Sequence, residues 1–146
     1  MSLEIASRST EGIEILDLHG QLIFGREDLD FRTELDRLVT AGMIRIALNL
    51  GDLRKLDSTG LGTLLFAQAK LHEAGGSLAI FDVKPSEIEL PAEVLLETEL
   101  KTFQDEKDAI DSFFPDRKVK HFDILEFIAS QKPKSQHPLS GAGKSA

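Results

Sequence analysis

Hydrophobic and polar positions along the first part of the chain predict two paired strands. Residues 13–18, IEILDL, alternate and are rich in β-forming side chains, so they predict a strand that ends at His19-Gly20. Residues 3–8 predict a second strand beside it, and the Glu11-Gly12 step marks the turn between the two.

A helix and a buried strand are predicted next. Four apolar residues recur at near-helical spacing with charges between them: Leu29, Leu35, Leu38 and Val39. They predict the apolar face of a helix that ends near Ala41-Gly42, where glycine suits a C-terminal cap. Residues 44–50, IRIALNL, are an almost continuous apolar run and predict a buried central strand. From Gly51 to Leu56 the chain is expected to cross the surface.

A second helix is predicted over Gly60–Ala74, followed by a strand at residues 77–83. On this helix Leu61, Leu64, Leu65 and Leu71 share one side, which is the expected core face. Phe66 falls on the other side, either as an incidental exposed residue or as part of a partner surface. The order strand, helix, strand, helix, strand predicts an α/β fold: a mixed sheet with parallel central strands and helices mainly on one face.

The C-terminal part carries weaker signals. Pro91 limits any helix near residues 88–96, and residues 105–114 predict an amphipathic helix that begins with acids. Residues 1–114 therefore form the expected domain, and residues 115–130 a helical extension. The extension is expected to pack on the same chain, with docking on another copy or protein as the alternative. Residues 131–146 are rich in proline, serine, glycine and lysine, which predicts a disordered tail.

Composition narrows the classes of function. The net charge is −8, although residues 131–146 carry three lysines and no acid, so direct nucleic-acid binding is not expected. The absence of cysteine excludes disulfides and thiolate chemistry. No apolar run approaches the roughly 18 residues of a membrane span, and the first residues do not resemble a secretory signal, so a cytoplasmic protein without membrane insertion is expected.

No catalytic motif or cofactor-binding motif is found. The chain lacks a Walker A loop, GxGxxG, HExxH and GxSxG. The histidines are scattered, at His19, His72, His121 and His137, so neither a metal site nor a cofactor is expected. The chain is therefore expected not to be an enzyme.

The sequence LDSTGLG, which precedes the second helix, concentrates polar residues and glycines. Asp57 and Ser58 can cap the free amides of the helix, and Gly60 and Gly62 remove side-chain bulk, so that another molecule can approach the backbone. One interpretation is a helix cap alone. The other is that Ser58 is modified or makes a contact, and a phosphorylation switch fits this better than a hydrolase, because no base lies near in the sequence.

Three segments carry a resemblance to a known family. Residues 48–83, LNLGDLRKLDSTGLGTLLFAQAKLHEAGGSLAIFDV, are similar to the central block of the STAS domain of bacterial anti-sigma factor antagonists. LHGQL at 18–22 and ETELKTFQDEKDAIDSF at 97–113 resemble other parts of the same domain. The resemblance covers about residues 3–114. KPSEIELPAEV departs from the family pattern through Pro85 and Pro91.

The resemblance implies a partner-switching function. Ser58 would be the phosphoacceptor. The unphosphorylated form would bind an anti-sigma factor that is also a serine kinase, and a PPM-type phosphatase would reset the switch. Together with Phe66, which helical spacing places on the outer side of the helix, the residues expected in partner binding are Asp57, Ser58, Thr59, Gly60, Leu61 and Gly62. The alternative is a STAS subunit of a lipid or anion transport system, or a scaffold of a stress-sensing complex. The oligomeric state stays open.

Overall fold

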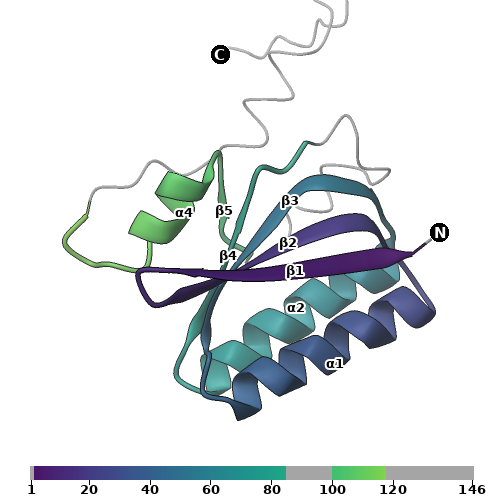
Figure 1. Ribbon diagram of the computed structural model, residues 1–146, viewed down its shortest axis with the longest axis horizontal. Helices are drawn as coiled ribbons and strands as arrows, with labels where there is room; N and C mark the ends of the chain where they lie inside the picture. The colour runs from purple at the N-terminus through teal and green to yellow at the C-terminus, as the bar shows by residue number, and fades with distance from the viewer. Residues whose placement is uncertain (1, 85–99, 118–146) are drawn as a thin grey trace, which may run out of the picture.

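A five-stranded sheet forms the centre of the computed structural model, which describes residues 2–84 and 100–117 (Figure 1). The strands lie in the order β1-β2-β3-β4-β5. They span Leu3–Thr10 (β1), Ile13–Leu22 (β2), Arg45–Leu56 (β3), Ser77–Phe81 (β4) and Thr102–Phe103 (β5). β1 is antiparallel to β2, and the other neighbouring pairs are parallel. The predicted mixed sheet with parallel central strands is confirmed.

Helices cover both faces of the sheet, although unequally. The long helices α1 (Arg26–Thr40) and α2 (Ser58–Glu73) lie side by side on one face, and the six-residue α4 (Glu106–Asp111) lies on the other (Figure 1). The prediction that helices lie mainly on one face therefore holds. The predicted helix near Pro91, the helical extension beyond residue 117 and the tail at 131–146 lie outside the described residues.

Two apolar cores explain the sequence of β3. Ile46, Leu48 and Leu50 point into the larger core under α1 and α2, whereas Ala47 points into the smaller core under α4. A strand that is covered on both faces needs apolar residues at successive positions rather than at alternate ones. The continuous run IRIALNL therefore marked the central strand correctly.

Three strands are longer than the sequence predicted, and β1 extends to Thr10 rather than to residue 8. β2 does not end at His19-Gly20 but continues to Leu22, with register shifts against β3 on both sides of that step. Gly20 has φ +110°, and a Cβ there would lie 2.1 Å from the carbonyl oxygen of Ser2. This glycine therefore permits an irregularity within the strand rather than a chain reversal. The turn predicted at Glu11-Gly12 is confirmed, since both residues have positive φ.

The segment from Gly51 to Leu56 was expected to cross the surface, and this is wrong. It forms the second half of β3, in which Leu53 and Leu56 are buried and pair with Gly20 and Leu22 of β2. The polar residues between these leucines interrupt the alternation of apolar and polar positions that predicts a strand. The short strand β5 was not predicted at all, because two residues are too few to show a period.

Two leucines assigned to core faces are exposed. In α1 the buried residues are Phe31, Leu35 and Leu38, while Leu29 is 63% exposed. Leu29 precedes Phe31 by two positions, which turns it about 200° around the helix, away from the sheet. In α2 Leu65 is 37% exposed, although Leu61, Leu64 and Leu71 are buried as predicted.

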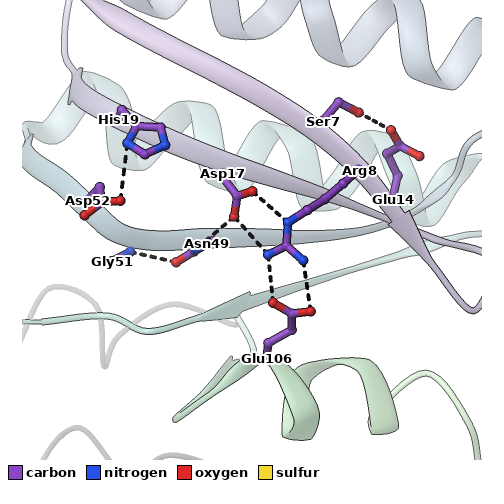
Figure 2. Close-up of polar contacts among 9 residues, drawn as sticks. All are labelled: Ser7, Arg8, Glu14, Asp17, His19, Asn49, Gly51, Asp52 and Glu106. Atoms are coloured by element: carbon purple, nitrogen blue, oxygen red, sulfur yellow. Dashed lines mark hydrogen bonds and ion pairs between the residues drawn. The ribbon is translucent and has the colours of Figure 1, made fainter.

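Arg8 connects the edge of the sheet to α4. Its guanidinium donates hydrogen bonds to Asp17 on β2, at 2.8 and 3.1 Å, and to Glu106 at the start of α4, at 2.7 and 3.0 Å (Figure 2). Asn49 on β3 donates a further bond to Asp17 at 2.8 Å. The hydrogen bonds from Arg8 lower the pKa of the Asp17 carboxyl below its usual value. One cation therefore joins β1, β2 and the first turn of α4.

We expect Arg8→Gln to destabilise the fold at pH 7 by about 1 kcal/mol, the upper range for a partly exposed ion pair. Because the pKa of Asp17 is lowered in the folded state, its contribution is complete above the unfolded value and is lost as the pH falls through the folded one. The difference in melting temperature between wild type and variant should therefore shrink below about pH 4. Arg37→Gln is the control for removal of one arginine, since the ion pair of Arg37 with Glu34 lies within α1 and connects no second element. An equal difference at pH 7 and pH 3 would contradict this account.

Candidate functional site

The LDSTGLG segment lies at the edge of the sheet where α1 and α2 both begin (Figure 1). Ser58 is the first residue of α2 and is exposed. Asp57 is the N-cap, and its Oδ1 accepts a hydrogen bond from the Gly60 amide at 2.8 Å. The predicted cap is therefore confirmed. Asp57 Oδ2 accepts a second bond, from the amide of Phe24 in the loop between β2 and α1, at 3.0 Å. This second bond was not predicted.

The two glycines of the motif have different environments. Gly60 is buried, and a Cβ there would lie 2.1 Å from the carbonyl oxygen of Leu22 and 2.7 Å from Cδ1 of Leu56. The interpretation that Gly60 admits another molecule is wrong, because Gly60 instead lets α2 pack against the end of β2. Gly62 is exposed, and no atom lies within 4 Å of its would-be Cβ. Internal packing therefore explains Gly60 and leaves Gly62 unexplained.

The residues implied in partner binding divide by exposure. Ser58, Gly62 and Phe66 are exposed on α2, Asp57 and Thr59 are half-buried, and Gly60 and Leu61 are buried. Leu65 is exposed as well, beside Phe66, although the sequence pattern assigned it to the core. The spacing of Ser58, Gly62, Leu65 and Phe66 places all four on the outward side of the N-terminal half of α2. We call these four residues the Ser58 surface.

A polar network between the helices supports one side of the Ser58 surface. Thr63 is fully buried and donates a hydrogen bond to the carboxylate of Asp28 on α1. Arg32 donates to Asp28 at 3.2 Å and to the Thr63 hydroxyl at 3.2 Å. The Arg32 guanidinium also lies 4.6 Å from the centre of the Phe66 ring. A stacked cation restricts the ring of Phe66, which is 39% exposed.

Two other kinds of feature, a cluster of metal ligands and a membrane-spanning helix, are not found among the described residues. Within residues 2–84 and 100–117, no three histidine or acidic side chains are grouped so that they could hold a metal ion. None of the helices in these ranges combines the length and the apolar character that a membrane span requires.

Comparison with known proteins identifies the family. The family model described as STAS domain matches residues 4–109. The chain belongs to the STAS domain family. The anti-sigma F factor antagonist of Paenibacillus polymyxa is 31% identical to this STAS chain over 86 residues, which are 58% of this chain and 73% of the relative.

Solved structures of STAS proteins share the fold. A putative anti-sigma factor antagonist from Thermotoga maritima superposes with a TM-score of 0.66 at 19% identity, covering 75% of this chain and 93% of that one. The phosphorylated form of SpoIIAA, a cell fate determinant from Bacillus, has a TM-score of 0.57 at 19% identity, covering 75% and 97%. At such identities these structures support the STAS fold alone.

We expect the two glycines to respond oppositely to alanine. Gly60→Ala should lower the free energy of unfolding by about 2 kcal/mol, because the new methyl group meets a backbone carbonyl. Gly62→Ala should raise it by about 0.5 kcal/mol, because alanine favours the helix and has free space here. Urea denaturation of both variants measures these changes. A loss of stability in Gly62→Ala would show that Gly62 serves the fold.

Proposed function

We propose that this STAS protein is an anti-sigma factor antagonist whose partner binding is switched by phosphorylation of Ser58. In its unphosphorylated form it binds an anti-sigma factor serine kinase and so releases the sigma factor. The kinase then phosphorylates Ser58, and a PPM-type phosphatase removes the phosphate. The observation that carries the proposal is the exposed Ser58 at the start of α2, followed by the bare Gly62. The name of the 31% identical relative from Paenibacillus polymyxa agrees with it.

The electrostatics at Ser58 suit a reversible switch. A phosphoryl group adds about −1.5 to −2 charges, and the free amides at a helix N-terminus favour such an anion. The carboxylate of Asp57, the neighbouring residue, opposes it, so the phosphate does not lock the fold into a new state. The main effect falls on the partner, which meets bulk and negative charge where it docked against a small neutral hydroxyl. A change of about 3 kcal/mol there weakens binding roughly a hundredfold.

The surroundings of Ser58 support a phosphoacceptor rather than a catalytic nucleophile. A serine nucleophile needs a base within hydrogen-bond reach. His72 lies on the same helix, but the rise along α2 separates it from Ser58 by about 21 Å. His19 lies on β2 and its Nδ1 is 3.3 Å from Asp52 (Figure 2). The chain therefore acts as a substrate and a binding module, and the kinase and the phosphatase supply the catalysis.

Phosphorylation tests the proposal directly. Wild-type protein and Ser58→Ala are incubated with ATP and the anti-sigma factor kinase of the same organism, and intact mass is measured. We expect one phosphate on the wild type and none on the variant, because Ser58 is the exposed hydroxyl of the motif. If neither protein gains phosphate while the kinase modifies another known substrate, Asp57 and Ser58 only cap the helix, and a transport subunit or a scaffold becomes the better interpretation.

We expect Phe66→Ala to weaken kinase binding about tenfold or more, the effect typical of an aromatic interface residue. The melting temperature should change little, because the Phe66 ring is partly exposed and packs on Arg32 at the surface. Calorimetric titration and thermal unfolding measure the two effects separately. Met43→Ala is the control, since Met43 is 43% exposed but lies beyond the opposite end of α1. Unfolding of Phe66→Ala would instead place Phe66 in the core.

A further inference from the structure

Phe24 has an unusual exposure for a phenylalanine. It is 78% exposed, the highest value among the large apolar side chains of the described residues. Single exposed apolar residues are common on protein surfaces. Phe24 is not isolated, however, because it lies in the loop bonded to Asp57, next to Ser58. Leu29 in the first turn of α1 is exposed as well, and so are Leu65 and Phe66 near the middle of α2.

Two separate contacts hold the Phe24 loop against the start of α2. The amide of Phe24 donates to Asp57 Oδ2 at 3.0 Å. Two residues earlier, the carbonyl of Leu22 lies so close to Gly60 that no side chain fits between them. The position of Phe24 is therefore set by residues of the same motif that carries Ser58.

The chemistry of Asp57 exceeds what a helix cap requires. An N-cap needs one acceptor oxygen, which serine, threonine and asparagine also supply. Asp57 uses one oxygen for the cap, at Gly60, and the other for the amide of Phe24. Asp105 caps α4 by accepting from the Asp108 amide at 2.9 Å, with the same arrangement of cap and helix. Asp57 and Asp105 are thus comparable helix caps in one chain. Asp57 differs in that it also accepts a hydrogen bond from the Phe24 loop.

We propose that Phe24 is a specificity-determining contact of the docking surface and that Asp57 positions it beside Ser58. This inference rests on the proposed function: the occupant is the anti-sigma factor kinase, with an apolar recess that takes the phenyl ring. Phe24 extends the Ser58 surface onto the loop before α1, because its amide is bonded to Asp57, the residue that precedes Ser58. Aromatic side chains with few rotamers are the residues that most often dominate such interfaces.

The positioning role is measured without any partner. Asp57→Asn keeps the cap oxygen but replaces the second oxygen with an amide group, which cannot accept from Phe24. We expect hydrogen exchange of the Phe24 amide, followed by NMR, to become about tenfold faster, as loss of a hydrogen bond to a charged group implies. The Gly60 amide should keep its protection. Asp105→Asn is the matched control and should leave Phe24 unchanged. Unchanged exchange at Phe24 in Asp57→Asn would overturn the positioning role.

The contact role is measured with the purified kinase. We expect Phe24→Ala to bind about tenfold more weakly than wild type, and Asp57→Asn to lose part of that affinity although its Phe24 is intact. Met43→Ala should bind as wild type does, since Met43 lies away from this end. If Phe24→Ala binds like wild type, the contact role is wrong. If wild type itself does not bind the kinase, the proposed function fails and the contact role with it, while amide exchange still decides the role of Asp57.

Discussion

Parallel pairing of β2 with β3 runs from Glu14–Ile46 to Leu22–Leu56, so both strands end at the same edge of the sheet. The chain leaves each strand at that edge and enters a helix, α1 from β2 and α2 from β3. The loop that carries Phe24 and the helix start that carries Ser58 therefore meet, although more than thirty residues separate them in sequence. Without the extension of β3 to Leu56, Asp57 would not reach the Phe24 amide.

The extension of β3 also explains why Gly60 must be small. Because Leu56 ends the strand against Leu22, the first turn of α2 lies directly over the end of β2. Close packing of that turn fixes the direction in which Ser58 and Gly62 face solvent. The bond between Asp57 and Gly60 then satisfies one of the free amides that the tight turn leaves at the helix start. The packing that stabilises the fold and the presentation of Ser58 are consequences of the same contact.

Local signals in the sequence predicted the parts of the site that depend on neighbouring residues. The cap at Asp57 and the exposure of Phe66 follow from residue type and helical spacing alone, whereas the helix predicted from Gly60 begins two residues earlier, at Ser58. The bond from Phe24 to Asp57 and the stacking of Arg32 on Phe66 join residues far apart in the chain, and no periodic pattern encodes them. Leu65 was misassigned because a helical wheel gives an angle, whereas burial depends on which neighbours cover that side.

The motif LDSTGLG therefore divides into residues that build the fold and residues that face a partner. Gly60 and Leu61 are buried, Asp57 caps the helix and holds a loop, and within the motif only Ser58 and Gly62 are exposed. The sequence alone does not reveal this division, because either glycine could leave room for another molecule at the helix start. A Cβ at one meets the backbone of β2, and a Cβ at the other meets nothing within 4 Å. A loss of binding after substitution at Gly60 would thus report on folding, and of the two glycines only Gly62 can report on the approach of another molecule.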